Sequence, residues 1–435
     1  METVIIIGAG AAGLTAANEL SLRGIPVVVI EANRRAGGRI RTTRSATGNL
    51  PIELGAEFIH GVPHELWQMI LAEGLQVHEV PDRHWQFANG KLSERENFWS
   101  ELSGVGAELK QSGPDMDVRS WLERKHNLSA RAKELALNFV EGFHAATADR
   151  MSVRAWARAN AESDEQEGRR AFRIQNGYQE IPRVMMARLR PRNVWIYFNA
   201  VAKSVRWEPG AVEVEAECSG VTRIFRAARV IVTVPLGVLK SEHRGIVFEP
   251  ALVEKEEAIS GLEMGHVVKV TLQFRLRFWH LENFGFVHAA NEWLPTWWAD
   301  ERGLILTGWA GGPKAGRLGE ESDDAIVEEA IRALSRIFGV EQQRVRDQLV
   351  ESWRHDWSRD PFARGAYSYT PVGMLDMPQR LGEPVANTIY FAGEATAKSG
   401  EQGTVHAAIA SGKRAAREIL ENTRTHFAVP QIARV

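Results

Sequence analysis

The chain opens with an apolar run, Val4–Ile7, that ends in a glycine-rich turn with the sequence GAGAAG at residues 8–13. A β-branched run of this kind is typical of a buried parallel strand. The small and apolar residues of 11–23 then recur at helical spacing, and a second apolar run follows at Val27–Ile30. We therefore predict a βαβ unit at the start of a parallel sheet.

The glycines of this turn predict a dinucleotide site. Gly8 permits the tight turn, Gly10 leaves room for a pyrophosphate, and Gly13 lets the helix pack closely against the strand. The phosphates would lie on the free amides at the helix N-terminus. Glu31 ends the second strand, where its carboxylate can bond ribose hydroxyls and would repel a 2′-phosphate. This motif alone does not distinguish NAD from FAD.

Length and composition restrict the class of protein. The 435 residues exceed what one compact core accommodates, so we expect two domains. A net charge of -2 provides no basic footprint for a nucleic acid. The single cysteine, Cys218, excludes an intrachain disulfide framework or a thiolate metal cluster and fits a reducing compartment. The histidines lack the pairing of a metalloprotease, so we expect no protein-held metal.

The sequence also bears on the cellular compartment of the protein and on membrane attachment. An apolar strand follows Met1 at once, which leaves no room for a signal peptide, and no apolar run approaches the roughly 18 residues of a membrane helix. We therefore expect a cytoplasmic protein without a membrane partner. No pattern in the sequence indicates an oligomeric state.

The pattern along the chain changes after residue 62. Residues 63–170 are helical and polar in pattern, which predicts an inserted helical region rather than a continuation of the sheet. Apolar runs at 194–198 and 229–234 return to the type of the first strand, and 201–214 alternates. Further strands are predicted at 265–279, 303–309, 349–353 and 388–391, and helices at 178–189, 323–338 and 403–420, followed by a loose tail after Asn422.

These patterns predict an α/β fold in which a Rossmann-type nucleotide domain is discontinuous. We assign it residues 1–62, 172–262 and 386–435. An inserted α+β substrate domain takes 63–171 and 263–385. Near the phosphate site, Gly38 would give clearance and Arg39 would bond a phosphate. Fourteen tryptophans, among them Trp293, Trp297 and Trp298, either fill the core or line an apolar cavity.

Motifs along nearly the whole chain resemble those of the flavin-containing amine oxidase family, which comprises monoamine oxidases, polyamine oxidases and related histone demethylases. The polyamine oxidase branch is the most similar. The motifs are GAGAAGL at 8–14, GGR at 37–39, ELGAEFIHG at 53–61, a lysine strand before Phe278-Trp279, WSRDPFARGAYSY at 357–369, FAGE at 391–394 and TVHAAIASG at 404–412. The resemblance implies a GR2-like FAD-binding domain.

The resemblance also assigns roles to matched positions. The FAD contacts would be Gly8, Gly10, Ala12, Gly13, Glu31, Ala32, Gly38, Arg39, Val201, Glu394, Thr404 and Val405. The amide of Val405 would face the flavin pyrimidine ring, where a helix N-terminus supplies about half a positive charge.

Four further matched positions concern catalysis. Lys269 resembles the lysine that addresses flavin N5 through a water, although a lysine on an apolar strand also serves to snorkel or to protect a sheet edge. Trp357 and Tyr367 resemble the aromatic residues on the substrate side of the flavin. His60 lies where polyamine oxidases carry His or Glu near the amine channel.

Two departures from the family pattern affect these expectations. Covalent monoamine oxidases attach FAD through a cysteine directly before the cage tyrosine, and that position is Ala366 here. Because Cys218 lies on a different segment, we expect FAD to be bound non-covalently. The second ring of the family's aromatic cage is also missing, since Ser399, Gly400 and Thr404 occupy its neighbourhood. This argues against a two-ring sandwich around a simple arylalkylamine.

The resemblance implies that FAD oxidises a small-molecule amine by taking a hydride from its α-carbon at N5. The product would be an imine, hydrolysed to an aldehyde or ketone, and oxygen would reoxidise the flavin to give hydrogen peroxide. Two alternatives stay open. One is a desaturase-like or protoporphyrinogen-oxidase-like enzyme on an apolar substrate, whose relatives lack the lysine strand and the DPxxxGxYS run; the other is a non-catalytic flavoprotein scaffold. The sequence does not identify the amine.

Overall fold

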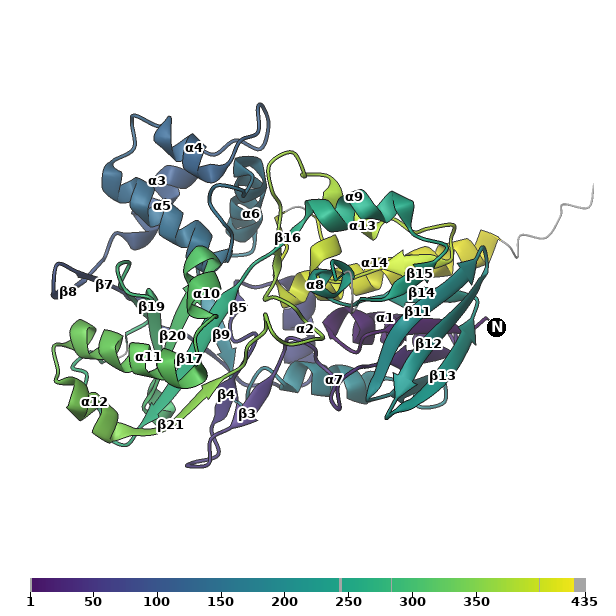
Figure 1. The fold of residues 1–435 in the computed structure, drawn as a ribbon, viewed down its shortest axis with the longest axis horizontal. Helices are drawn as coiled ribbons and strands as arrows, with labels where there is room; N and C mark the ends of the chain where they lie inside the picture. The colour runs from purple at the N-terminus through teal and green to yellow at the C-terminus, as the bar shows by residue number, and fades with distance from the viewer. Residues whose placement is uncertain (1, 242–244, 283, 399, 426–435) are drawn as a thin grey trace, which may run out of the picture.

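The computed structural model describes residues 2–241, 245–282, 284–398 and 400–425 of the chain (Figure 1). Figure 1 shows two lobes, one holding the N-terminus and the long C-terminal helix α14 (Val405–Thr425), the other holding a second sheet and a group of helices. The loose tail was expected after Asn422, but α14 continues to Thr425, and the rest of that tail lies outside the described residues, as does Ser399.

The first lobe is built on a five-stranded sheet in which every pairing is parallel. Its first strands and the helix α1 between them are the predicted βαβ unit, which is confirmed. The order is β10-β2-β1-β14-β23, with β1 Val4–Ile7, α1 Ala11–Leu22, β2 Val27–Ile30, β10 Val194–Tyr197, β14 Arg229–Val232 and β23 Ile389–Phe391. Distant stretches of the chain thus meet in one sheet, whose central strands β1 and β14 are fully buried.

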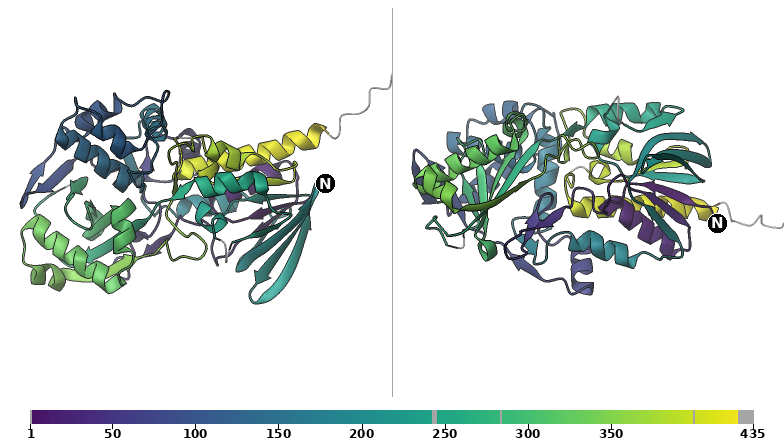
Figure 2. Two further views of the ribbon diagram at one scale, coloured as in Figure 1. Left: turned by 45° about the horizontal axis from the view of Figure 1, so that its top comes forward. Right: turned by 60° about the horizontal axis from the view of Figure 1, so that its bottom comes forward.

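Different layers cover the two faces of this sheet, as Figure 2 shows. Helices α1, α14 and α7 (Glu180–Arg188) bury Leu14, Ile409 and Ile181 against one face. The other face packs on a second, mixed sheet, which contributes Val205 and Val214 to the shared core. That sheet has the order β13-β12-β11-β15, with β11 Ala200–Glu208, β12 Ala211–Cys218, β13 Val221–Ala227 and β15 Val247–Glu249. In it β12 pairs antiparallel with β11 and β13, and β15 pairs in parallel with β11.

Close packing at the start of α1 depends on a missing side chain. A Cβ at Gly13 would lie 2.0 Å from the carbonyl oxygen of Gly8, so only glycine lets the helix approach the turn this closely. This is the structural role that the glycine motif predicts for Gly13.

The second lobe contains a seven-stranded sheet covered by helices. The predicted helix at 323–338 is α11 (Asp323–Phe338), which begins after the N-cap Ser322 and ends at Gly339 in the left-handed region. The sheet order is β21-β17-β20-β19-β18-β7-β8, with β21 Leu349–Arg354, β17 Val267–Phe274, β20 Ile305–Gly311, β19 Thr296–Asp300, β18 Phe286–His288, β7 His84–Ala88 and β8 Lys91–Glu94. Helices α10 (Gly312–Leu318) and α12 (Gln342–Gln348) complete this layer.

Residues 63–170 are only partly helical, which corrects the sequence prediction. The helices are α2 His64–Ala72, α3 Phe98–Gly106, α4 Val118–Glu123, α5 Ala130–Phe143 and α6 Val153–Glu165. However, β7 and β8 form a hairpin that extends the seven-stranded sheet, since β7 pairs in parallel with β18. None of the described residues of 63–170 joins the five-stranded sheet, as the sequence predicts. Its turn is Asn89-Gly90, both at positive φ (52° and 71°). Such an Asn-Gly pair is a strong hairpin signal that the helical interpretation overlooked.

Short elements connect the two lobes. Three small sheets pair β3 Thr42–Arg44 with β4 Pro51–Glu53, β16 Glu263–Met264 with β22 Ser368–Tyr369, and β5 Ile59–His60 with β9 Ala171–Ile174 and β6 Val77–Glu79. The remaining helices are α8 Leu236–Leu239, α9 Val253–Gly261 and α13 Met377–Gly382, with single 3₁₀ turns at Glu301–Gly303 and Glu394–Thr396. Among the residues that the structure describes, no helix has the length and apolar character needed to cross a membrane.

Candidate active site

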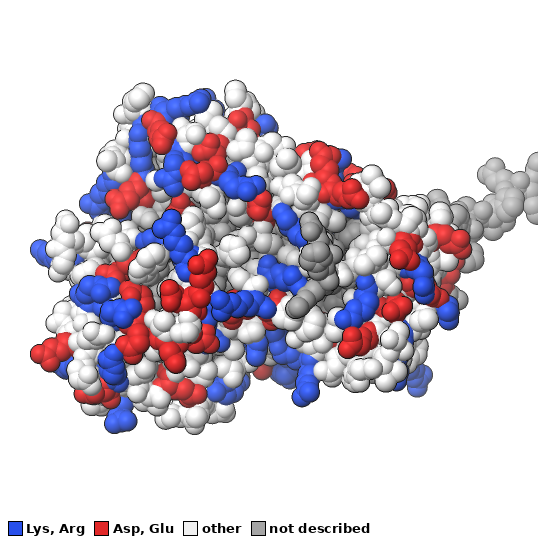
Figure 3. Space-filling view, viewed as in Figure 1, with Lys and Arg blue, Asp and Glu red and all other residues white. Residues whose placement is uncertain are grey.

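A cavity of about 1280 Å³ extends from the glycine turn of the first lobe into the second lobe. Gly10 and Val201 line one end of it, and Lys269, Trp298 and Tyr367 line another part. The surface in Figure 3 carries acidic and basic side chains interspersed, in keeping with the small net charge. Within the described ranges, no three His, Cys, Asp or Glu side chains gather so that they could hold a metal ion.

Nearly all of the predicted site residues line this one cavity. They are Gly8, Gly10, Ala12, Glu31, Ala32, Gly38, Arg39, His60, Val201, Lys269, Trp357, Tyr367, Glu394, Thr404 and Val405. Gly13 does not line it, since its place is in the contact between α1 and the preceding turn. The structure therefore brings together residues that are up to 397 positions apart in the chain, from Gly8 to Val405.

The glycine turn fits a pyrophosphate. Gly8 has φ +111°, and a Cβ there would lie 2.6 Å from Oγ1 of Thr233. A Cβ at Gly10 would meet nothing within 4 Å, so this position faces open space in the cavity. Gly10 is also the N-cap of α1 and contributes no side-chain cap. The amides of the first helical turn are thus directed at a space where an anion can lie.

Glu31 is buried at the end of β2 beside this turn. Its Oε2 accepts a hydrogen bond of 2.7 Å from the amide of Ala9, and its Oε1 accepts one of 2.8 Å from the amide of Asn33. The side-chain amide of Asn33 also donates to Oε1, at 3.0 Å. A carboxylate has about four acceptor positions, so about one remains for a hydroxyl donor. This arrangement suits a ribose, as the sequence motif predicts.

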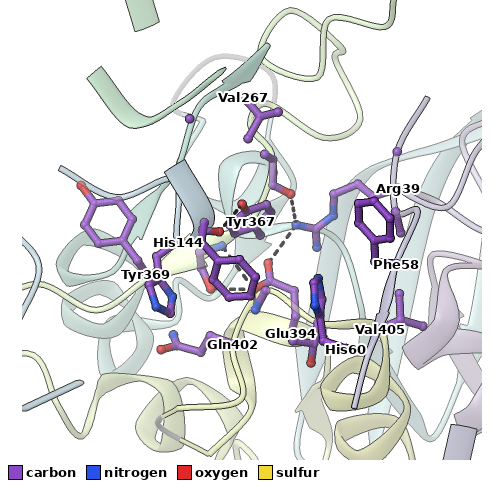
Figure 4. Close-up of a pocket in the computed structure, with 18 of the residues that line it drawn as sticks. Arg39, Phe58, His60, His144, Val267, Tyr367, Tyr369, Glu394, Gln402 and Val405 are labelled. Atoms are coloured by element: carbon purple, nitrogen blue, oxygen red, sulfur yellow. Dashed lines mark hydrogen bonds and ion pairs between the residues drawn. The ribbon is translucent and has the colours of Figure 1, made fainter. Parts of the chain in front are cut away.

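Arg39 and Glu394 join two distant segments at the cavity wall (Figure 4). The Nη1 group of Arg39 donates to Oε1 of Glu394 at 2.9 Å and to the carbonyl of Ala366 at 2.6 Å. Oε2 of Glu394 accepts from the hydroxyl of Ser368 at 2.7 Å and from the amide of Gly403 at 3.0 Å. Glu394 thereby fixes the glycine loop before α14 relative to the Arg39 loop.

The N-terminus of α14 opens on the same cavity. Thr404 caps it, donating to the carbonyl of Glu401 at 2.9 Å and accepting from the amide of Ala407 at 3.2 Å. Val405 follows in the first turn and lines the cavity. Two helix N-termini, those of α1 and α14, therefore direct positive dipole ends into one space.

Lys269 lies on the cavity face of β17. All eight residues of this strand are buried, and Val268, Val270 and Leu272 pack into the core beneath α11. Because side chains alternate along a strand, Lys269 projects from the opposite face. β17 lies between β20 and β21, so the alternative of an edge-protecting lysine is wrong.

Glu57 is the partner of Lys269, and the sequence did not predict this pair. Nζ of Lys269 lies 2.6 Å from Oε2 of Glu57. Oε1 of Glu57 accepts from Nε of Arg173 and from Nε1 of Trp298, each at 2.9 Å. Burial opposes ionisation of this carboxyl, but Lys269 and Arg173 hold the pKa of Glu57 below its usual value. A glutamate within an apolar, glycine-flanked stretch was the signal for such a buried pair.

Aromatic residues form much of the cavity wall. Nε1 of Trp357 donates to the carbonyl of Leu54 at 2.8 Å, and the Tyr367 hydroxyl donates to the carbonyl of Phe143 at 2.7 Å, so both rings are held in place. The three tryptophans named in the sequence analysis lie in different environments. Trp298 lines the cavity, Trp297 is fully buried in the core, and Trp293 is exposed.

His60 lies in the cavity with its ring 5.1 Å from that of Phe143 and 5.9 Å from that of Phe58 (Figure 4). Burial, followed by the charge of His406, lowers the pKa of His60 to about 4. His60 is therefore a neutral ring at physiological pH. It can offer a ring face or one hydrogen bond to a ligand, but no positive charge that would repel an ammonium.

Glu53 lies behind the lysine and gives a prediction on pH dependence. Burial raises its pKa to about 7, against the hydrogen bonds from the Tyr178 amide and the Thr42 hydroxyl. In the unfolded chain a glutamate ionises near pH ~4.3. Between these values the unfolded state binds fewer protons, so the wild-type protein loses stability as pH rises.

The variant Glu53→Gln should lack this dependence. We expect its free energy of unfolding, relative to wild type, to increase by about 3 kcal/mol from pH 4 to pH 8. Thermal melts of both proteins over that range measure it. If the free energies of unfolding of wild type and variant differed by the same amount at every pH, the raised pKa of Glu53 would be contradicted.

Comparisons with known proteins identify a family. Residues 11–420 match the model of the family described as flavin containing amine oxidoreductase. A probable polyamine oxidase 4 of Arabidopsis thaliana is 30% identical over 94% of this chain and 85% of its own length. Polyamine oxidase 2 of the same plant is also 30% identical, over 96% of this chain and 87% of its own.

Solved structures share the fold. A putrescine oxidase bound to putrescine has a TM-score of 0.81 and 22% identity, covering 97% of this chain and 99% of that one. Cyclohexylamine oxidase from Brevibacterium oxydans IH-35A has a TM-score of 0.81 and 20% identity with the same coverage. The predicted class, a Rossmann-type GR2-like α/β fold with an inserted α+β region, is confirmed. Because the family match spans nearly the whole chain, the protein is a member of the flavin-containing amine oxidoreductase family.

Proposed function

We propose that this protein is an FAD-dependent amine oxidase of the polyamine oxidase type. The observation that carries the proposal is the position of a buried lysine, Lys269, in the same cavity as two helix N-termini and a glycine turn suited to a pyrophosphate. The two polyamine oxidases at 30% identity support the choice of branch. The substrate would be a small amine and the acceptor molecular oxygen.

The residues present fit FAD. Gly8, Gly10, Glu31 and Arg39 would hold the adenosine and pyrophosphate, with Ala12, Ala32, Gly38 and Val201 beside them, and Glu394, Thr404 and Val405 would lie along the flavin part. Gly13 acts through close packing of α1. The nucleotide domain would comprise 1–62, 172–262 and 386–435, and the substrate domain 63–171 and 263–385. We also propose a cytoplasmic location, consistent with the single cysteine.

When bound, FAD would supply the redox chemistry: it would accept a hydride from the amine α-carbon and pass the two electrons to oxygen, so that the amine would become an imine, hydrolysed to an aldehyde or ketone, and oxygen would become hydrogen peroxide. The chain contributes the environment. Trp298, Trp357 and Tyr367 exclude water, and a desolvated site lowers the pKa of a bound amine and so favours its neutral form. The neutral form has the lone pair that stabilises the developing iminium. Lys269 presents a proton on Nζ to the cavity.

The test is to mix the purified, flavin-loaded protein without oxygen with a panel of amines. The panel contains di- and polyamines, simple arylalkylamines, and apolar polyenes or tetrapyrroles. We expect an amine to bleach the flavin absorbance and, once oxygen is admitted, to yield peroxide. Bleaching by the apolar compounds alone would favour the desaturase-like alternative, and no bleaching together with a stable co-purifying protein would favour a scaffold.

FAD should be released when the protein is denatured, because the position before Tyr367 is Ala366 and Cys218 lies on β12, among residues that do not line the cavity. Acid precipitation followed by centrifugation measures the result: the yellow colour should pass into the supernatant. Colour that stays with the pellet after washing in denaturant would show a covalent bond and contradict the prediction.

A further inference from the structure

The carboxyl group of Glu57 is enclosed by hydrogen-bond donors. Its two oxygens lie against Lys269, Arg173 and Trp298, and its side chain is 10% exposed. A protonated carboxyl would have to donate a hydrogen bond, and each of these three partners donates rather than accepts. Glu57 therefore suits only its ionised form. Glu57 also lines the cavity, so that negative charge lies beside Lys269 at the cavity wall.

Most of the N–H donors of Lys269 already have a partner. An ammonium carries three N–H donors. One is directed to Oε2 of Glu57 at 2.6 Å and a second to the carbonyl of Gly55 at 3.2 Å. Nζ also lies 5.9 Å from the ring centroid of Trp298, which favours a cation. One N–H of Lys269 is thus left for the cavity that the residue lines.

Other charged groups lie further behind the pair. Arg173 on β9 also donates to the carbonyl of Ala299 at 2.9 Å. A second cavity, of about 20 Å³, is bordered by Glu57 and Arg173 together with Glu53 on β4, Asp300 on β19 and Arg302. Arg302 and Asp300 pair with each other at 2.6 Å. Glu57 is therefore the direct counter-ion of Lys269.

We propose that Glu57 is a positioning residue that keeps Lys269 in its ammonium form and directs its remaining N–H into the cavity, so that Lys269 meets the flavin as a fixed cation and donor, not as a base. The inference rests on the proposed function in one respect, since it requires that FAD occupy this cavity. A cation fixed beside the flavin stabilises the negative charge that the flavin gains on reduction.

The test is the variant Glu57→Gln, measured by the reduction potential of the bound flavin from pH 6 to pH 9. Glutamine keeps the size and can accept from Arg173, but it leaves Lys269 as a buried cation without a counter-ion. Without a counter-ion, burial disfavours the charged form of this lysine. At low pH the variant keeps the ammonium but has lost the charge of the carboxylate, so we expect its potential to lie above that of wild type. As pH rises and the unpaired lysine gives up its proton, the potential should fall relative to wild type. Glu123→Gln, at an exposed position on α4, is the matched control and should follow wild type.

A double variant tests whether the pH dependence comes from loss of the positive charge at position 269. In the double variant Glu57→Gln with Lys269→Arg, the guanidinium stays charged without a counter-ion, so the extra pH dependence should disappear. Thermal melts of the same flavin-loaded preparations give an independent readout. If the unpaired lysine gives up its proton in the folded protein, the folded state binds fewer protons than the unfolded chain, so Glu57→Gln should gain stability, relative to wild type, as pH rises.

A wild-type potential at every pH in Glu57→Gln would overturn the proposal. Should that variant not fold, Glu57→Asp retains the charge but draws the carboxylate back by one methylene, and an intermediate shift is expected; no shift would again overturn it. These titrations use a chemical reductant and need no amine. A shifted potential in a protein that oxidises no amine would therefore reject the proposed function and leave this inference standing.

Discussion

Replacing Lys269 with methionine is expected to slow flavin reduction by the amine, flavin reoxidation by oxygen, or both, by about 10²-fold or more while FAD stays bound. Loss of a positioned proton donor commonly costs a factor of this size. Methionine has a similar length and suits the buried strand β17, whose residues are all buried. Glu57 keeps Arg173 and Trp298 as partners, so the variant should fold. Anaerobic and oxygen-mixing stopped-flow measurements resolve the two half-reactions.

The matched control is Lys91→Met, which removes one exposed lysine from β8 in the same sheet. Its two half-reactions should run at wild-type rates. Unchanged rates of both half-reactions in Lys269→Met would remove Lys269 from the mechanism, whatever its place in the cavity. Loss of FAD from the variant would instead assign the lysine a part in binding.

The sequence alone predicts the elements that have a clear hydrophobic periodicity or a turn that requires glycine. The β1-α1-β2 unit follows from the buried β-branched run Val4–Ile7 and from the glycine turn that leads into α1. Helix α11 follows from its apolar stripe, with Ser322 and Gly339 marking its ends. In both places propensity, burial and capping favour the same structure.

The sequence pattern does not predict the β7–β8 hairpin, because the residues around it in the stretch 63–170 have a mostly helical pattern. β7 has only one fully buried residue, His84, so its apolar alternation is weak. Its place at the end of the seven-stranded sheet depends on pairing with β18, about two hundred residues away. Such pairing is a tertiary effect that local propensity does not contain. The Asn89-Gly90 turn was the one local signal.

The partner of Lys269 could not be predicted for a similar reason. Lys269 and Glu57 are separated by more than two hundred residues, and the pair depends on how the two lobes meet. The sequence shows a lysine on an apolar strand, which is equally consistent with an edge position. Only the pairing of β17 with both β20 and β21 excludes the edge. The tryptophans divide likewise, because alternation along β19 sends Trp297 to the core and Trp298 to the cavity.

Replacing Glu394 with alanine is expected to weaken FAD binding by about 10²-fold, which corresponds to about 2.7 kcal/mol. The side chain of Glu394 is 5% exposed and pairs with Arg39. Its removal also frees the hydroxyl of Ser368 and the amide of Gly403, so the loop before α14 loses its tie to the Arg39 loop. Removing one partner of a buried pair is strongly destabilising, so the melting temperature should fall as well. FAD titration of the flavin-free protein, followed by fluorescence, measures the affinity.

Two further variants distinguish the loss of the Glu394 charge from a general disturbance of α14 and the loop before it. Glu418→Ala removes an acid from α14 that pairs with Arg414 at 3.0 Å one helical turn away, and such a partly exposed pair contributes only about 0.3–0.5 kcal/mol. It should bind FAD like wild type. Glu394→Gln keeps an oxygen for Gly403 but no charge for Arg39, so its FAD affinity should lie between those of wild type and Glu394→Ala. Wild-type affinity in Glu394→Ala would mean that the Arg39 loop and the start of α14 hold their places without this carboxylate, and the cofactor role of Glu394 would then have to be withdrawn.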